Sequence, residues 1–279
     1  MNKDTILKKI RSRVTEGQEW MVDNIQYLTL MGSHAYGTHH ENSDWDVYGF
    51  TIPPIEYVYP SSSGFIYGYD DFPKFDQFRG EVEGETKKDS LDFQIYNIAK
   101  YFKLVEANNP NMVDSLFTAR NCVLIETEIA TLVRKNRHLF LHKGSWHKFK
   151  GYAFSQLNKI KTDPDGRESP ERKALIEKYG YDTKFAVHIF RLLDEVEQIL
   201  LGGNIDLTRN REQLKSVMKG FYTLEEVHIY FKQMETRLQH IYENSALPWG
   251  PEIHHEEIRD LLQECLENFY FGGVTQWAE

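Results

Sequence analysis

The chain has little cysteine, no long apolar run and no excess of positive charge, and each absence excludes a class of protein. Its two cysteines, Cys122 and Cys265, lie far apart and in no Cys-x-x-Cys pair, so the sequence predicts neither a disulfide framework nor a zinc knuckle. No stretch of about 18 or more apolar residues is present, and the first residues contain no continuous apolar segment of a secretory signal. We therefore expect a cytoplasmic protein without a membrane partner.

Charge and composition set further bounds. The formal net charge of -9 over 279 residues argues against a protein that coats nucleic acid through a general basic surface, because neutralising phosphates requires clustered Lys and Arg. A hydrophobic fraction of 41% and a charged fraction of 27% are typical of a folded chain. The length favours two domains of ordinary size.

The first half of the chain mixes strand and helix patterns. IQYLTLMGS (residues 25–33) and WDVYGFTI (45–52) are rich in strand-forming residues, and the stretch between them has turn chemistry throughout. Residues 53–84, rich in Gly, Pro and aromatics, predict a long irregular excursion. Residues 89–110 predict a short strand that passes into a helix ended by Asn-Asn-Pro.

The second half is helical by its apolar spacing. Helices are predicted over residues 145–161, 181–203, 223–245 and 258–272. Residues 163–170 (DPDGRESP) predict a polar loop, and Thr223 with Glu226 predicts a capping box. We expect an α+β fold: a mixed sheet with flanking helices over residues 1–135, followed by an all-helical domain over residues 136–279.

The stretch MGSHAYGTHHENSDWDVYGF, residues 31–50, concentrates the candidate chemistry. If WDVYGF forms a strand, Asp44 and Asp46 point to the same face, because side chains alternate with period two. Two like charges this close raise each other's pKa unless a cation such as Mg²⁺ lies between them. Gly32 would allow a close backbone approach to a ligand, and Ser33 could offer its hydroxyl and nearby amides to phosphate oxygens.

This order of residues resembles a known family. A strand, Gly32-Ser33, a spacer and then Asp44-Trp45-Asp46 resembles the signature of the DNA polymerase β-type nucleotidyltransferase superfamily. The fuller string GSHAYGTHHENSDWDVYG is similar to nucleotidyltransferases associated with RNA ligase and RNA repair in bacteria and phages. The resemblance extends through DFQIYNIAKYFKLVEANNP and the helices of the second half, and so covers most of the chain. It implies a nucleotidyltransferase-type sheet.

The resemblance also implies a two-metal nucleotidyl transfer. The Asp-x-Asp pair of the family holds Mg²⁺ (or Mn²⁺), its Gly-Ser turn binds the triphosphate of an NTP, and a third carboxylate helps to activate the attacking hydroxyl. Asp92, at the head of DFQIY, is our candidate for that third role, with Asp89 and Glu85 as rivals. The family's Asn-Pro-x-x-x-Glu motif ends here in Asp114, whose shorter reach gives no reason to assign it a catalytic task.

Candidate nucleotide-binding residues lie in both halves. Lys184, His188 and Arg191 share one helix face at i, i+4 and i+7, and this face could grip a triphosphate or an RNA end. The alternative is a solvated face with His188 as a packing residue. His34 directly follows Ser33, so we expect it to face the nucleotide as well.

The sequence thus predicts a nucleotidyltransferase that moves a nucleoside monophosphate from an NTP to a hydroxyl, with an RNA end as the favoured acceptor and an RNA ligase as a possible functional associate. The acidic net charge keeps a small-molecule or protein acceptor open. Two other classes also stay open. One is a nucleotide-binding regulatory or antitoxin-like protein of low turnover, and the other is a Mg²⁺-dependent phosphodiesterase with the same metal site.

Overall fold

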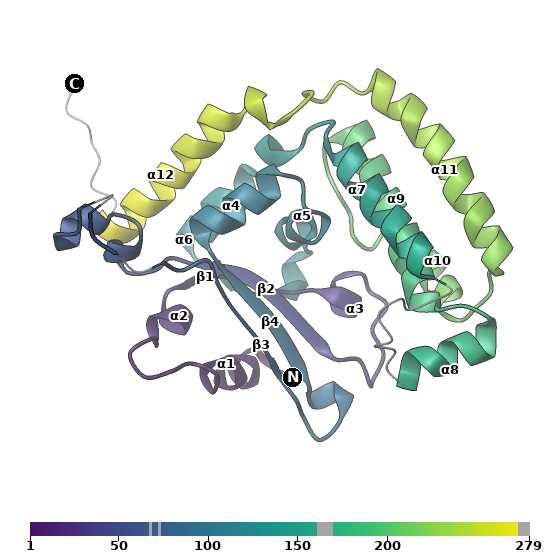
Figure 1. Cartoon of the computed structure of the whole chain (residues 1–279), viewed down its shortest axis with the longest axis horizontal. Helices are drawn as coiled ribbons and strands as arrows, with labels where there is room; N and C mark the ends of the chain where they lie inside the picture. The colour runs from purple at the N-terminus through teal and green to yellow at the C-terminus, as the bar shows by residue number, and fades with distance from the viewer. Residues whose placement is uncertain (67–68, 72–73, 161–169, 273–279) are drawn as a thin grey trace.

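The computed structural model describes residues 1–66, 69–71, 74–160 and 170–272, and within them a five-stranded mixed sheet forms the centre of the molecule (Figure 1). The strands lie in the order β3-β4-β2-β1-β5. Their bounds are β1 Ile25–Leu30, β2 Trp45–Thr51, β3 Gln77–Val82, β4 Leu91–Asn97 and β5 Val123–Glu126.

The parallel pairing of β2 with β4 determines the layout of this sheet, because the other neighbouring strands pair antiparallel. Parallel neighbours need a long crossover that returns the chain to the same end of the sheet. Residues 52–90 make that crossover, and β3 lies within it as the outer strand beside β4. As a result, the start of β4 lies beside the start of β2.

Six helices of the described chain accompany the sheet in the first half. They are α1 Lys3–Arg11, α2 Trp20–Asp23, α3 Gly32–Ala35, α4 Ile98–Glu106, α5 Pro110–Phe117 and α6 Glu128–Lys135. α1 and α2 lie on one side of the sheet and α4, α5 and α6 on the other (Figure 1). The Asn-Pro pair starts α5, since the Asn109 side chain accepts a hydrogen bond from the Met112 amide and Pro110 takes the first helical position.

The second half, as far as it is described, is helical. Its helices are α7 Ser145–Lys159, α8 Pro170–Tyr179, α9 Thr183–Gly202, α10 Arg211–Met218, α11 Leu224–Asn244 and α12 His255–Phe271. α9 packs against α7, α10 and α11, whereas α12 returns to pack on α4 and α6 (Figure 1). The predicted capping box of Thr223 and Glu226 is present at the start of α11.

The hydrophobic core has two parts, one on each face of the sheet. The smaller part joins α1 to the sheet through residues such as Ile6, Val47 and Phe93. The larger part begins at Tyr27 and Phe50 on the other face and continues through α4, α5 and α6 into α7, α9, α10, α11 and α12. Buried apolar contact therefore runs without a break from the sheet into the helices that follow it.

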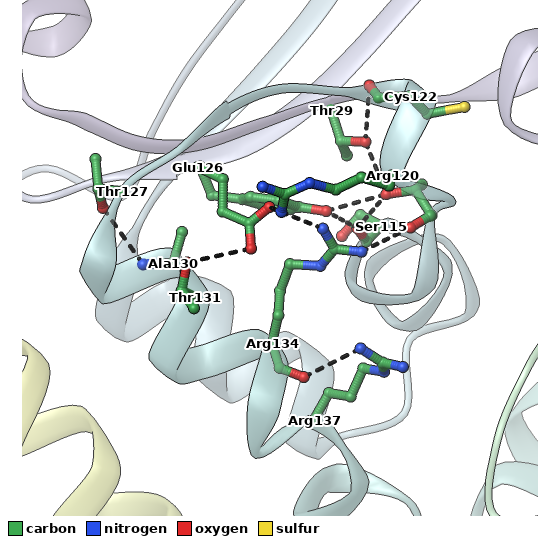
Figure 2. Close-up of polar contacts among 12 residues, drawn as sticks. Thr29, Ser115, Arg120, Cys122, Glu126, Thr127, Ala130, Thr131, Arg134 and Arg137 are labelled. Atoms are coloured by element: carbon green, nitrogen blue, oxygen red, sulfur yellow. Dashed lines mark hydrogen bonds and ion pairs between the residues drawn. The ribbon is translucent and has the colours of Figure 1, made fainter.

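A polar network fixes α5 to strand β1 and α6 to strand β5 (Figure 2). Arg134 of α6 binds the Glu126 carboxylate at 3.1 Å and the Thr118 carbonyl at 2.7 Å. The Tyr27 hydroxyl on β1 donates to the Ser115 carbonyl at 2.7 Å. The C-terminal end of α5 is thereby tied to the sheet.

Most of the predicted elements are confirmed, as is the α+β fold class. The strands at 25–33 and 45–52, the strand-to-helix passage at 89–110 and the helices of the second half are present. The prediction of a wholly irregular excursion over 53–84 was wrong, because Gln77–Val82 forms β3. The prediction of turn structure throughout residues 33–43 was also wrong, because α3 occupies the first residues of that stretch.

One strand was missed, and two further expectations are not tested by the described residues. β5 was not predicted, and the loop expected at 163–170 falls almost wholly outside the described residues. The domain boundary after residue 135 stays a prediction. None of the helices in the described ranges is long and apolar enough to cross a membrane.

Candidate active site

Three carboxylates gather where β2 and β4 begin. Asp46 and Asp92 are partners in the parallel register, so their side chains leave the same face of the sheet. Asp44 lies just before β2, two residues from Asp46. Asp46 is half-buried, whereas Asp44 and Asp92 are exposed. The structure therefore brings together the three acidic residues that the sequence nominated.

Burial, and after it the charges of neighbouring carboxylates, raises the pKa of two members of this group. Burial, with the charges of Asp44 and Asp92 added to it, raises the pKa of Asp46 to about 7, and Lys184 opposes that rise. Burial also raises the pKa of Asp92, with further contributions from Glu81 and Asp44. At neutral pH the fold thus carries carboxylates that would gain from a nearby cation.

A glycine turn lies directly against Asp46. Gly32 opens α3 with a φ of 56°, in the left-handed region. A Cβ on Gly32 would overlap Oδ2 of Asp46, and the Met31 amide donates to the Asp46 carbonyl at 2.8 Å. Only glycine gives the turn both this backbone conformation and this close approach to the carboxylate.

Ser33 opens onto a cavity of about 430 Å³. Its hydroxyl is buried and has no hydrogen-bond partner among the described residues. Asp44 and Lys184 line the same cavity, and the loop of residues 38–43 and parts of α8 and α10 contribute to its wall. The cavity is within the size range of small-molecule sites, and its lining includes a serine, an aspartate and a lysine.

Helix α9 contributes one basic residue, Lys184, to the lining of this cavity. Asp182 caps the helix by accepting from the Lys184 amide at 2.9 Å, which sets the first turn and with it the side chain of Lys184. His188, one turn later, is half-buried. Burial, followed by the charges of Arg191, Arg172 and Lys184, lowers the pKa of His188 to about 3, so its imidazole is neutral. A neutral imidazole among cations can donate or accept one hydrogen bond at a polar ligand.

Arg191 lies apart from the cavity, although it shares the helix face of Lys184 and His188. It is 2% exposed, forms an ion pair with Asp114 and donates to Glu195 at 3.2 Å and to the Tyr36 hydroxyl at 2.8 Å. The sequence expectation that Arg191 grips phosphate has no support in this geometry, because its guanidinium is taken up by buried partners.

His34 is held in a stack of rings. Its imidazole lies between Trp45, at 4.2 Å between ring centroids, and His39, at 4.6 Å. Burial, together with the charge of His39, lowers the pKa of His34. The imidazole Nε2 is buried and unpartnered within the described chain. The ring borders a second cavity, which also contains His40 and Ser43 of the Ser33 cavity wall.

The register favours Asp92 over its rivals as the third carboxylate. Asp89 precedes β4 in a 3-10 turn and accepts a hydrogen bond from the Thr86 hydroxyl at 2.5 Å. Glu85 lies further from the strand and is exposed. Asp92 alone of these three pairs with Asp46 across the parallel strands.

The donor set suits a divalent cation, although it does not form a complete cage. No group of three or more His, Cys, Asp or Glu side chains in the described ranges is arranged to hold a metal ion. Mg²⁺, however, is commonly bound by one or two carboxylates with substrate phosphates and water as the remaining ligands. Burial, followed by repulsion from Asp44 and Asp92, raises the pKa of Asp46, and such an ion would offset the cost of ionising this carboxylate. The residues present therefore fit Mg²⁺ shared with a bound phosphate.

Sequence reasoning missed two charged neighbours of this site. Glu81 of β3 is the partner of Asp92 in the antiparallel register, and its alternating context QFRGEV was the available signal. Lys87 lines the cavity beside Ser33 from the turn before β4. It was overlooked because a Lys-Lys pair in a polar turn has no spacing that identifies a ligand site.

The chain is similar to one protein family over most of its length. The model of the RlaP family, described as the RNA repair pathway DNA polymerase beta family, matches residues 3–244. Among solved structures, a nucleotidyltransferase-like protein from Exiguobacterium sibiricum 255-15 is similar at 12% identity and a TM-score of 0.32, with 99% of this chain and 96% of that chain covered. Among curated proteins, none matches the chain significantly.

Proposed function

The chain belongs to the RNA repair pathway DNA polymerase beta family, and on this basis we propose that it is a Mg²⁺-dependent enzyme that transfers a nucleoside monophosphate from an NTP to a hydroxyl. Membership supports nucleotidyltransferase activity in general. The observation that carries the specific proposal is the pairing of Asp46 with Asp92 beneath the Gly32–Ser33 turn. The proposed metal ligands and the proposed phosphate-binding turn are thereby adjacent.

We assign the carboxylates to the metal. Asp44, Asp46 and Asp92 would hold Mg²⁺ or Mn²⁺, which when bound supplies Lewis-acid activation of the acceptor hydroxyl and offsets charge on the departing pyrophosphate. The task of the carboxylates is to fix the reacting groups in line. Asp46 is the best placed of the three, since it is half-buried and touches the turn.

The nucleotide would occupy the cavity next to these carboxylates. Ser33 and Lys184 line this cavity, and we assign Ser33 with the neighbouring Gly32 backbone to the phosphates and Lys184 to a point charge beside them. His188, one turn along α9 from Lys184, would add a hydrogen bond from its neutral imidazole. His34 continues from the turn into its ring stack, where a base or ribose edge could meet it. Lys184 also lies close enough to Asp46 to lower that residue's pKa.

An RNA end is the proposed acceptor, and an RNA ligase is a proposed functional associate. The family description places this group in RNA repair. The net charge of -9 argues for a short contact with the RNA terminus and not for a long basic track along the strand. A small-molecule or protein acceptor is the alternative that experiment has to exclude.

The test is a transfer assay with each α-labelled NTP, Mg²⁺ or Mn²⁺, and three acceptor pools: RNA, small alcohols and the protein itself. The matched control is the Asp44→Ala/Asp46→Ala variant. Label that reaches RNA in the wild type alone supports the proposal. Label on another acceptor corrects the substrate class. NTP binding with no transfer under any condition would instead establish a regulatory protein, and hydrolysis of a phosphodiester without NTP would establish a phosphodiesterase.

A further inference from the structure

Four side chains from three separate parts of the sequence form a buried ionic cluster. Tyr36 follows α3, Asp114 lies on α5, and Arg191 and Glu195 lie on α9. All four are at most 8% exposed. Arg191 forms an ion pair with Asp114, donates to Glu195 at 3.2 Å, and lies over the Tyr36 ring with its guanidinium carbon 4.6 Å from the centroid.

Tyr36 is the link between this cluster and the glycine turn. Its hydroxyl donates to Asp114 at 2.9 Å and accepts from Arg191 at 2.8 Å. Its own amide donates to the Gly32 carbonyl at 3.2 Å, which closes the single turn of α3. Movement of the Gly32–Ser33 turn would therefore pull on the Tyr36 ring and its two charged partners.

Arg191 links the same cluster to Lys184, because both residues are on α9, two turns apart. Ser33 and Lys184 both line the cavity. We propose that Arg191 is a positioning residue, which through Tyr36 and Asp114 fixes the Gly32–Ser33 turn at a set distance from Lys184. The functional part of this proposal rests on the proposed function, since it takes the cavity to be the NTP site.

The composition of the cluster favours a positioning role over a purely stabilising one. Burying an ion pair costs desolvation free energy, and well-packed apolar residues would often stabilise the same place as well or better. Here two carboxylates share one guanidinium, and Oδ1 of Asp114 and Nε of Arg191 have no partner within the described chain. What the ionic cluster provides beyond packing is fixed direction, because hydrogen bonds hold each group at a defined angle.

Helix α5 supplies a rigid base for this arrangement. Asp114 lies one residue before Ser115, whose carbonyl accepts the hydrogen bond from the Tyr27 hydroxyl of β1. Thr118, just beyond the helix, is held by Arg134 in the network of Figure 2. The sheet therefore anchors Asp114, and Asp114 in turn anchors both Arg191 and Tyr36.

The test compares two conservative variants, Tyr36→Phe and Tyr270→Phe. Each removes one tyrosine hydroxyl that donates a hydrogen bond, but the hydroxyl of Tyr270, on α12, donates to the Pro53 carbonyl at 2.6 Å, outside the cluster and the turn. Two quantities are measured: hydrogen exchange of the backbone over residues 31–38, and the Kd of the Mg²⁺–NTP that binds the wild type most tightly. The thermal midpoint controls for general loss of stability.

We expect Tyr36→Phe to speed exchange over residues 31–38 and to raise the Kd about tenfold, the order expected for losing hydrogen bonds to charged groups. Tyr270→Phe should lower the thermal midpoint without either effect. Unchanged exchange in Tyr36→Phe, equal changes in both variants, or faster exchange with an unchanged Kd would each overturn the proposal. A wild type that binds no NTP refutes the proposed function and with it the functional part of this proposal, whereas the exchange comparison still decides whether the cluster fixes the turn.

Discussion

Asp46 is a carboxylate that the fold makes costly to ionise. Its pKa of about 7 lies above the ordinary value of 3.8, so the folded chain holds a proton there that the unfolded chain has already lost. The stability contributed by the protonated carboxyl is complete below about pH 4 and is lost as the pH rises toward 7. At neutral pH without metal, Asp46 therefore opposes folding.

Replacing Asp46 by asparagine should separate stability from activity. At pH 8 the Asp46→Asn variant should melt at a higher temperature than the metal-free wild type, and at pH 4 the two should be nearly equal. Nucleotidyl transfer should fall by at least about 10²-fold, the order seen when one electrostatic stabiliser of a transition state is removed. Differential scanning fluorimetry and the transfer assay measure the two effects. A lower melting temperature at pH 8 would show that Asp46 is already compensated.

His188 should affect stability in a different pH range and with the opposite sign. Its folded pKa of about 3 lies below the ordinary 6.5 because burial and the charges of Arg191, Arg172 and Lys184 oppose protonation. As the pH falls below 6.5, the unfolded chain takes up this proton and the folded chain does not. The contribution of neutral His188 to the free energy of unfolding is therefore complete above pH 6.5 and is progressively lost toward pH 3.

The variant His188→Gln should therefore reduce the pH dependence of stability. Between pH 6 and 4, its free energy of unfolding should fall less steeply than that of the wild type, by up to about 1.4 kcal/mol per pH unit, which corresponds to one proton. Urea denaturation at a series of pH values measures the slope. His228→Gln, on the exposed face of α11, controls for the loss of a histidine. Equal slopes in wild type and His188→Gln would contradict the assigned neutral state.

At the scale of elements, α3 depends on a single glycine. Alanine at position 32 would have to adopt a left-handed φ of 56° and would overlap the Asp46 carboxylate. Gly17 provides a matched control, because it has a φ of 82° and nothing within 4 Å of an added Cβ. Gly17→Ala should cost the backbone strain alone, roughly 1–2 kcal/mol.

Gly32→Ala should cost more than Gly17→Ala and should weaken NTP binding, because the overlap can be relieved only by moving the turn or the carboxylate. Chemical denaturation and calorimetric titration with NTP give the two values. Similar losses of stability in both variants, with NTP affinity retained, would mean that the turn is not held against Asp46.

Some elements could be predicted from sequence because their signals are local. β1 and β2 have runs of strand-forming residues, and α9 has apolar residues at helical spacing followed by Gly-Gly. β3 was missed because QFRGEV lies in a stretch dominated by turn residues, and its pairing with β4 is a tertiary effect. β5 spans only Val123–Glu126, too short for periodicity to reveal.

The same distinction applies to the site. The shared face of Asp44 and Asp46 followed from the alternation of side chains along a strand, while the pairing of Asp46 with Asp92 depends on a parallel register that no local pattern contains. Arg191 was expected to bind phosphate because it shares a helix face with Lys184 and His188. Its partner Asp114 lies 77 residues away, so its burial could not be read from spacing.

For the whole molecule, the continuous larger core predicts cooperative unfolding of sheet and helices. Phe149 of α7 is fully buried in this core, whereas Phe154 on the same helix is 52% exposed. Phe149→Ala should cost about 3–5 kcal/mol, and hydrogen exchange should accelerate equally in β1 and α9. Phe154→Ala is the control and should change little. Faster exchange confined to α7 and α9 would instead show that the halves unfold independently.

The buried pairing of Asp114 with Arg191 has a consequence for synthesis on the ribosome. By the time β4 has emerged, the chain contains every carboxylate of the site, and α5 follows soon after. The guanidinium that compensates Asp114 is made 77 residues later. Until then, closing α5 over Asp114 would bury a charge without a counter-charge, which is strongly unfavourable. The nascent first half should therefore stay open around α5 until α9 leaves the exit tunnel, so that the turn and the carboxylates reach their final arrangement only in a nearly finished chain.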